Sequence, residues 1–218
     1  MARIIVNGSK VQIASGYATA FALTNISNAA TAVVTCGTAH GVGSGDYFEI
    51  THCDWSRLAG RAFRAQATSA TTITVEGLDT ASTALYPSGT ITGTAKEVSG
   101  WVDVAQVNEL SVSGGEQQYA EGQYLDIPLV FRYPTVKSAL NVSVNVDDDQ
   151  SATFWTHVKA SESATSNRTM RVVDVNNVPR ILCTGIWSRS SAPAVAVNNV
   201  LKRQIGVAVA AEVTEYTS

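Results

Sequence analysis

Cysteine and histidine side chains that could hold a metal ion gather in one short part of the chain. They are Cys36, His40, His52 and Cys53, and thiolates and imidazoles are the usual protein ligands of zinc. His52 and Cys53 are adjacent, however, and adjacent residues of a strand point to opposite sides. Both therefore cannot easily face one ion, and we expect buried cysteines and a turn histidine rather than a metal site.

Two other segments resemble ligand-binding loops only in part. Residues 41–46 are rich in glycine, but they lack the Lys-Ser/Thr pair of a phosphate-binding loop and precede a strand instead of a helix. Residues 147–149 are three aspartates without the alternating spacing and closing glutamate of a calcium loop. The acidic run suits the start of a helix, where Asp149 or Ser151 is predicted to be the cap.

No set of side chains predicts a reaction. His157 has no serine or cysteine near it in the setting of a nucleophile, and Ser113 lacks the flanking pattern of a nucleophile elbow. The chain has 15 Lys+Arg against 18 Asp+Glu, a formal net charge of −3, so it lacks the basic footprint of a duplex-binding protein. We therefore expect no catalytic residues, no cofactor and no enzymatic activity.

The composition is that of a folded chain whose surface is poor in charge. Of the 218 residues, 45% are hydrophobic and only 15% are charged, whereas about 25% is usual for soluble domains. This excludes global disorder and suggests a surface that contacts other protein. Three cysteines are an odd number, which argues against a disulfide framework and favours a reducing compartment. The first apolar stretch is too short for a signal peptide, and no apolar run is long enough to span a membrane. We therefore expect folding in a cytoplasm without membrane insertion.

Short strands separated by turns every ten residues or so predict an all-β fold. We expect an N-terminal part with short strands over residues 3–6 and 11–14 and an aperiodic arm from about residue 16. This part would belong to the same domain as the last part, a β-sandwich with one flanking α-helix, and a small inserted β-module would lie between them. These three parts cover residues 1–29, 30–98 and 99–218, with the helix near 149–161. Phe154, Trp155 and Val158 form the predicted apolar stripe of this helix, which would pack against a sheet.

Alternating apolar residues predict strands with one buried face in the last part of the chain. Val142, Val144 and Val146 share one such face. Near the C-terminus, residues 201–213 read as a long strand, and its apolar face includes Ile205, Val207 and Val209. We interpret this strand as an exposed sheet edge between subunits, because so long and weakly charged an edge is an aggregation hazard unless a neighbour covers it. Asn176 and Asn177 predict the turn of a hairpin.

The segment over residues 113–123 is polar and reads as a long loop. It links strands predicted over 101–112 and 124–131, and tight hairpins need far fewer residues. Long loops on rigid sheets often contact partners. An ordinary solvated hairpin tip explains the same residues equally well.

The order of these parts carries a resemblance. It comprises the entry strand and loop V-x-x-V-N-E-L-S-V-S-G-G-E-Q-Q-Y, then L-D-I-P-L-V-F-R-Y, then S-A-L-N-V-S-V-N-V, the helix, the hairpin and the final strand. In this order the chain resembles the major tail tube proteins of long-tailed, non-contractile (siphovirus-type) bacteriophages. The segment T-A-H-G-V-G-S-G-D-Y-F-E-I also resembles a small β-module common in phage tail proteins.

The resemblance implies a structural virion protein, assembled in the bacterial cytoplasm. Its subunits would close into hexameric rings that stack into a hollow conduit for ejection of the viral genome. Its partners would be further copies of itself, the tape measure, tail terminator and tip proteins, and viral DNA that passes without specific binding. By analogy, the 113–123 loop would reach the adjacent ring through Gln117, Gln118, Tyr119 and Glu121.

Two alternative functions stay open on the sequence. A tail terminator or connector would share the fold but stop at one ring. A carbohydrate-binding β-sandwich would need exposed aromatic side chains, for which Trp55, Trp101 and Trp187 are the candidates.

Overall fold

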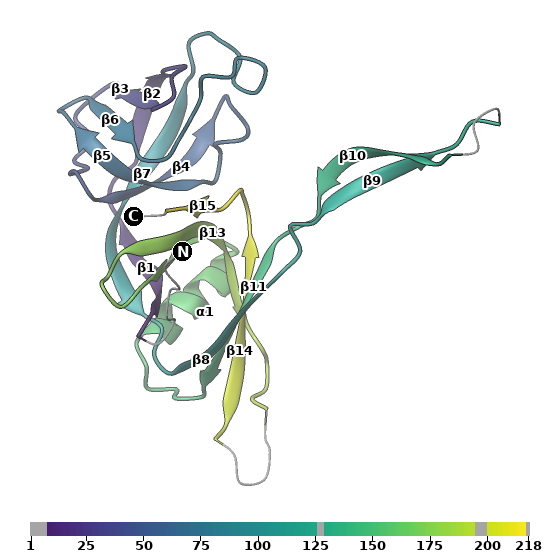
Figure 1. The fold of residues 1–218 in the computed structure, drawn as a ribbon. Helices are drawn as coiled ribbons and strands as arrows, with labels where there is room; N and C mark the ends of the chain where they lie inside the picture. Colours follow the sequence, from purple (N-terminus) through teal and green to yellow (C-terminus); the bar gives the residue numbers. More distant parts are fainter. Residues whose placement is uncertain (1–7, 126–128, 195–199, 217–218) are drawn as a thin grey trace.

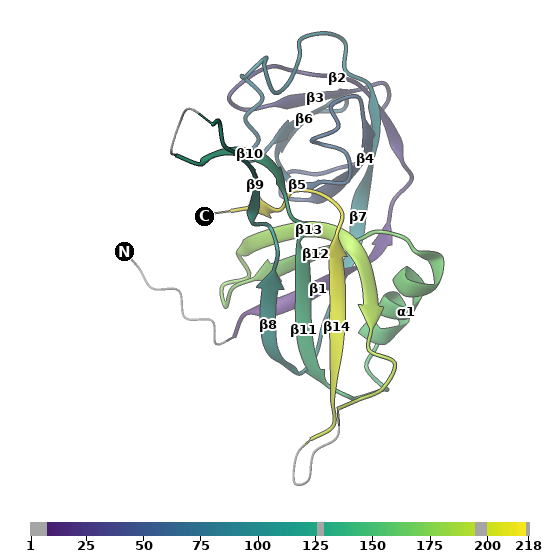
Figure 2. The same ribbon diagram turned by 90° about the vertical axis from the view of Figure 1, so that its right-hand side faces the viewer.

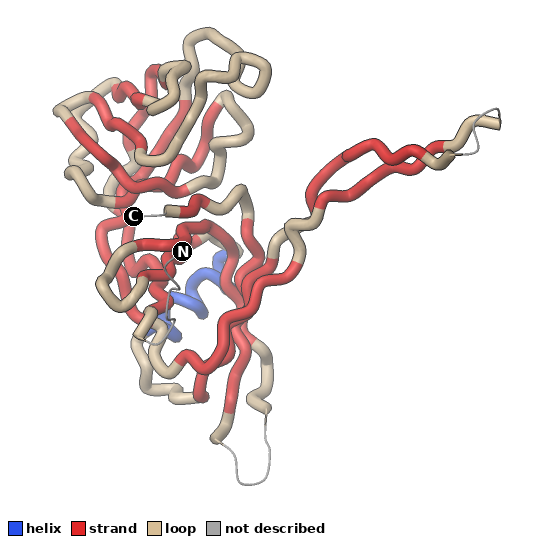
Figure 3. Tube along the Cα trace, in the orientation of Figure 1, coloured by secondary structure: helices blue, strands red, loops and turns tan. Residues whose placement is uncertain are grey.

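Fifteen β-strands and one α-helix make up the described part of the chain, which comprises residues 8–125, 129–194 and 200–216 of a computed structural model (Figures 1 and 3). The predicted all-β class with a single helix is confirmed. Valine and threonine are the commonest residues of the strands, as expected for β-branched residues that pack well on a pleated surface. The strand bounds are β1 Lys10–Tyr17, β2 Phe21–Ile26, β3 Val33–Cys36, β4 Tyr47–Cys53, β5 Ala62–Thr68, β6 Thr72–Val75, β7 Gly93–Asp103, β8 Val107–Ser113, β9 Gln117–Gly122, β10 Phe131–Lys137, β11 Asn141–Asp147, β12 Arg168–Val173, β13 Pro179–Arg189, β14 Lys202–Val209 and β15 Thr214–Glu215.

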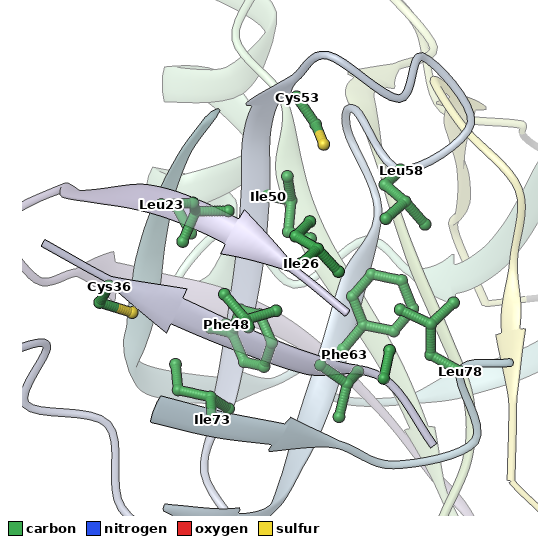
Figure 4. Packing of buried hydrophobic residues seen from close by; sticks show 14 of the residues in the cluster. Leu23, Ile26, Cys36, Phe48, Ile50, Cys53, Leu58, Phe63, Ile73 and Leu78 are labelled. Carbon is green, nitrogen blue, oxygen red and sulfur yellow. The ribbon is translucent and has the colours of Figure 1, made fainter. Parts of the chain in front are cut away.

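Six strands close into a small barrel at one end of the molecule (Figures 1 and 2). Their order is β2-β3-β6-β5-β4-β7, and a further pairing between β2 and β7 completes the ring. Closure leaves no free edge among these strands. Phe48, Phe63 and Ile73 fill the interior and are fully buried (Figure 4). The barrel thus has a core of its own.

Strand β7 runs on from the barrel into a second, curved sheet. Its first half pairs with β2 and β4, and residues 98–103 pair with β1. The curved sheet continues in the order β7-β1-β12-β13-β14-β11-β8. Because one strand is hydrogen-bonded on both sides of the junction, the barrel and the curved sheet are covalently and structurally continuous.

The N-terminal segment differs from its prediction. The strand expected over residues 11–14 is confirmed within β1, whereas the one expected over 3–6 lies outside the described residues. The predicted arm from residue 16 is wrong over β2, which pairs with β3 and β7. Ala, Thr and Asn there gave little alternation because only Phe21, Leu23 and Ile26 of this strand face the barrel core.

The helix α1, Phe154–Ala164, packs against the concave side of the curved sheet (Figures 1 and 2). Its predicted apolar stripe is confirmed, since Phe154, Trp155 and Val158 are all buried. They join the second core, which is built on alternating side chains of β1, β11, β13 and β14. Burial of this stripe stabilises a helix that would be marginal alone.

The predicted helix cap is wrong. The helix is preceded by Thr153 in helical conformation, with no side-chain cap hydrogen bond. Asp149 instead accepts hydrogen bonds from the backbone N–H and the hydroxyl of Ser151, at 2.9 and 2.6 Å. A carboxylate that closes a turn two residues on lies one turn too early to reach the orphan N–H groups of α1.

The predicted exposed edge strand is also wrong. Strand β14 lies between β11 and β13, and Ile205 and Val207 are buried under α1 and its neighbours. Alternation reports that one face of a strand is buried, but it does not report how many strands lie beside it. In the described main sheet, the last strand of the order is β8, which pairs only with β11.

The long loop predicted over residues 113–123 is wrong over β9, which forms a hairpin with β10. Strands β9 and β10 pair with each other and with no other described strand. The strand predicted over 124–131 is wrong, because Tyr124, Leu125, Leu129 and Val130 lie outside the strands. The strand predicted over 101–112 is interrupted by a turn at residues 104–106, where Gln106 has φ 57°.

The turn predicted at Asn176 and Asn177 is confirmed, with φ 61° at Asn177.

Candidate assembly surface

The β9–β10 hairpin forms an arm that stands off the rest of the subunit. We define the arm as residues 116–137; Figures 1 and 3 show it projecting far from both cores. Its register places Phe131 opposite Gly122 and Tyr133 opposite Ala120. None of its described residues is buried. An isolated two-stranded hairpin is only marginally stable in water, so contact with another surface would stabilise the arm.

Large apolar side chains are concentrated on this arm. Twelve large hydrophobic residues are exposed in the described chain, and seven of them belong to the arm. They are Tyr119, Tyr124, Leu125, Leu129, Val130, Tyr133 and Val136. Exposed apolar side chains gathered on one element are typical of a surface that contacts another protein.

Three aromatic rings along the arm pack on one another. The ring centroids of Tyr124 and Phe131 are 4.9 Å apart, and those of Phe131 and Tyr133 are 5.4 Å apart. The Phe131 ring lies over Gly122, where an added Cβ would approach it to 2.6 Å. The absence of a side chain at Gly122 therefore leaves room for the Phe131 ring against the hairpin backbone.

The polar residues predicted as contacts all lie on β9 or at its start. Gln117 donates through Nε2 to the Gln118 carbonyl at 3.1 Å. Glu121 forms an ion pair with Arg132 at 2.7 Å, with both side chains more than half exposed. The structure brings Gln117, Gln118, Tyr119 and Glu121 onto one arm, and their contact with a neighbouring subunit stays a prediction.

Sequence reasoning missed the apolar part of the arm. The run L-V-F-R-Y reads as an ordinary buried strand, because nothing local distinguishes a strand buried in its own chain from one exposed on a hairpin. Leu125, Leu129, Phe131 and Tyr133 even share the odd positions of an alternating pattern, so periodicity alone gave no signal that this segment is exposed.

Two glycines and a serine define the point where the arm leaves the sheet. Gly114 and Gly115 have φ of 86° and 78°, and a Cβ on Gly114 would overlap the carbonyl oxygen of Ala139. Gly115 donates its N–H to the Ser138 carbonyl at 3.2 Å, and Ser138 donates its N–H to the backbone carbonyl of Glu116 at 2.9 Å. The arm therefore has a hydrogen-bonded root with a backbone conformation that favours glycine.

A groove of about 900 Å³ opens beside this root. The curved sheet supplies Leu140, Val209 and Val213, the arm supplies Val136, and the barrel supplies Arg57. Its lining is mostly apolar and includes four charged residues, Arg57, Lys137, Glu212 and Glu215. We call it the root groove.

The family to which the chain belongs follows from comparison with known proteins. A family model described as phage tail tube protein matches residues 53–218. The chain belongs to the phage tail tube protein family. A comparison with curated proteins found no match. Tail tube proteins are structural components of the virion, which agrees with a subunit whose most exposed element is an apolar arm.

The cysteine and histidine residues considered as ligands are dispersed in this tail tube subunit. Cys36 and Cys53 are buried in the barrel core, and His40 accepts a hydrogen bond from the N–H of Val42 at 3.1 Å. Within the described ranges, no group of three or more Cys, His, Asp or Glu residues is placed to hold an ion. Burial raises the pKa of Cys36 to about 11 and that of Cys183 to about 12, so these thiols stay protonated at neutral pH.

A buried polar cluster joins the barrel to the curved sheet. Glu49 of β4 lies 3.6 Å from the Lys96 ammonium and accepts a hydrogen bond from the Thr169 hydroxyl at 3.1 Å. The Lys96 ammonium lies 3.8 Å from the ring centroid of Tyr17. Burial raises the pKa of Glu49, and the positive charge of Lys96 acts in the opposite direction. Removal of one partner would leave buried polar groups unpaired, so the cluster orients the two parts of the tail tube subunit.

The tryptophans proposed for sugar binding are not available for it. Trp55 and Trp187 are buried, at 5% and 0% exposure. Trp101 is half-buried, with the Arg171 guanidinium 4.3 Å from its ring centroid. The described helix is also too short and polar to span a membrane. The burial of the tryptophans and the short, polar helix are both compatible with a tail tube subunit.

Proposed function

We propose that this tail tube protein closes into hexameric rings, and that the rings stack into a hollow tube through which the viral genome is ejected into the host. The observation that carries the proposal is the exposed apolar arm on an otherwise well-packed subunit. Its side chains lose contact with water only when another molecule covers them. A projecting element that contacts a different surface of the next copy makes a head-to-tail polymer.

The free strand β8 supports lateral association as well. Its side chains are mostly exposed, Val112 by 54%, and its outer backbone groups have no strand partner in the described chain. Such an edge pairs readily with another chain. We propose that it lies at the contact between subunits within a ring.

The proposed partners are the tape measure, tail terminator and tip proteins, with assembly in the bacterial cytoplasm. Viral DNA would pass through the lumen without specific binding. The net charge of −3 supports this, because a conduit wall should not attract phosphate. The role is structural and not enzymatic.

We also propose a division into two folding units. The barrel core contains side chains from Phe21 to Ala95, and the second core begins at Val11 and resumes at Val104. The barrel unit would then include β2, which lies before the boundary proposed from the sequence at residue 29.

Replacement of the arm tests the proposed function. Residues 116–137 are exchanged for Asn-Gly, which suits the two-residue turn that Gly115 and Ser138 can close. We expect electron microscopy of the purified parent protein to show six-fold annuli and tubes, and the variant to remain a folded, unassembled subunit.

Circular dichroism and a thermal melt establish that the variant is folded. Tubes of normal length from the variant would contradict the role of the arm. Single rings from the parent protein at every concentration would instead favour a tail terminator or connector.

A further inference from the structure

The last described residues of the chain contact both the curved sheet and the barrel. We call residues 212–216 the strap. Two of them, Thr214 and Glu215, form β15, which pairs with Leu182 and Ile181 of β13. Figure 1 shows β15 between β13 and the barrel, and side chains of the strap form hydrogen bonds with residues 61–64 at the start of β5. The strap therefore bridges the junction where the two parts of the subunit meet.

A buried charge of the barrel depends on the strap. Arg61 is only 9% exposed, and its guanidinium lies 4.9 Å from the ring centroid of Phe63. It donates hydrogen bonds to the Glu212 carboxylate at 3.3 Å and to the Thr214 hydroxyl at 3.4 Å. Both of these partners belong to the strap. Since an unpaired buried charge is strongly destabilising, loss of the strap favours any movement that returns this guanidinium to water.

Two side chains of the strap also contact the barrel backbone. The Thr214 hydroxyl donates to the Ala62 carbonyl at 3.0 Å, and the Tyr216 hydroxyl accepts the N–H of Arg64 at 2.7 Å. The Tyr216 ring belongs to a small buried cluster with members from β1, β4, β5, β7 and β13, and to neither of the two main cores. Tyr216 thus packs at the junction and not inside the barrel or under α1.

Two glycines face each other where β7 leaves the barrel. Gly16 of β1 is paired with Gly100 of β7, and the ladder shifts register on both sides of Gly16. Glycine has no side chain to pack, and an irregular ladder lets a strand bend. We call these two residues the glycine pair. The Glu49 cluster lies beside it, because Tyr17 follows Gly16 and its hydroxyl is 3.2 Å from that of Thr169. The cluster therefore holds this point together, whereas the strap contacts the barrel at β5.

We infer that the strap holds the barrel in one orientation on the curved sheet, and that the barrel pivots at the glycine pair when the strap detaches. Strand β15 has two residues, and β13 is its partner strand in the described chain, so few backbone hydrogen bonds oppose detachment. In the attached state Arg61 is paired with the strap, and in the detached state water hydrates it. The strap thus sets the balance between two orientations of the barrel. This inference does not depend on the proposed assembly into tubes.

Distance measurements between two spin labels on the full-length chain test the pivot. Gln66→Cys on the barrel and Gln204→Cys on β14 provide the label sites, because both positions are exposed. The three native cysteines are buried and do not compete for the label. Dilution in unlabelled protein restricts the measurement to pairs within one chain. We expect one narrow distance distribution in the parent protein and a distribution at least about twofold broader in a chain that ends at Ala211, since a hinged part samples several orientations.

Two point variants separate the barrel contacts from general loosening of the C-terminus. Tyr216→Ala removes the ring at the junction, and we expect it to broaden the distribution as the truncation does. Glu215→Ala is the matched control, because Glu215 is exposed and lines the root groove; we expect it to keep the narrow distribution. Circular dichroism and a thermal melt establish that each protein is folded.

The outcomes distinguish the strap from an ordinary chain end. A narrow, unshifted distribution in folded Tyr216→Ala protein would overturn the inference, whether or not the truncated chain folds. Equal broadening by Glu215→Ala would also overturn it, because the effect would then not come from the contacts with the barrel. Neither result would alter the proposed tube function, which electron microscopy tests separately.

Discussion

Asp174 organises the turn between β12 and β13. Its Oδ1 atom accepts the N–H groups of Asn176 and Val178, both at 2.9 Å. Its Oδ2 atom accepts a hydrogen bond from Nη2 of Arg180 at 2.7 Å. The hydrogen bond from Val178 and the guanidinium of Arg180 lower the pKa of Asp174 below the ordinary aspartate value. The ionised carboxylate therefore stabilises this hairpin.

The exchange Asp174→Asn should show this stabilisation as a pH dependence. A lowered folded-state pKa adds stability above the ordinary value of 3.8, and this contribution is lost as the pH falls through the folded-state pKa. We expect the variant to be less stable than the parent protein at pH 7, and we expect the difference in stability to shrink as the pH falls below 3.8. Urea unfolding at a series of pH values measures it. A difference that stays constant with pH would contradict the role of the charge.

At the scale of elements, strands β13 and β14 approach closely at Gly185. A Cβ at this position would overlap the carbonyl oxygen of Ala208 on β14. The two strands carry Trp187 and Val207 of the second core. Backbone cannot move aside as a flexible side chain can, so the packing of α1 on the sheet depends on this glycine.

We expect Gly185→Ala to lower the free energy of unfolding by about 1–3 kcal/mol, as overpacking does. Gly206→Ala on β14 is the matched control, because its Cβ would meet only the Ser188 hydroxyl, at 3.3 Å. The control should be as stable as the parent protein or slightly more, since glycine is disfavoured inside a strand. Urea titration compares the three proteins, and equal stability of both variants would contradict the close approach.

At the scale of the whole molecule, a well-packed body carries an arm with exposed apolar side chains. Two packed cores and the Glu49 cluster hold the body together, while the arm contributes nothing to either core. The chain as a whole is poor in charge, with 15% charged residues. Burial of apolar surface is therefore the main driving force available for assembly.

Salt should consequently not reverse assembly. Ion pairs at a surface weaken as the Debye length falls from about 10 Å at 0.1 M to about 3 Å at 1 M salt. Apolar contacts do not weaken, and sulfate strengthens them. We expect light scattering of assembling subunits to be maintained in 1 M NaCl and to rise with ammonium sulfate. Dissociation of tubes in NaCl would assign the contacts to ion pairs.

The sequence alone determined the features that depend on near neighbours along the chain. Val142, Val144 and Val146 alternate with polar residues and are buried, Phe154, Trp155 and Val158 form the apolar stripe of the helix, and Asn177 adopts the positive φ of its turn. Each follows from the period of a strand or helix or from the conformational freedom of one residue.

Only the tertiary structure decided which strands lie side by side. It placed β14 between β11 and β13, closed the barrel through β2 and β7, and left the β9–β10 arm exposed. Strand pairing depends on hydrogen bonds between residues far apart in the chain, and the apolar pattern of β14 would be the same at an edge or at the centre. The arm is the reverse case: its apolar residues are exposed in this chain, because the surface that we propose to cover them belongs to another copy.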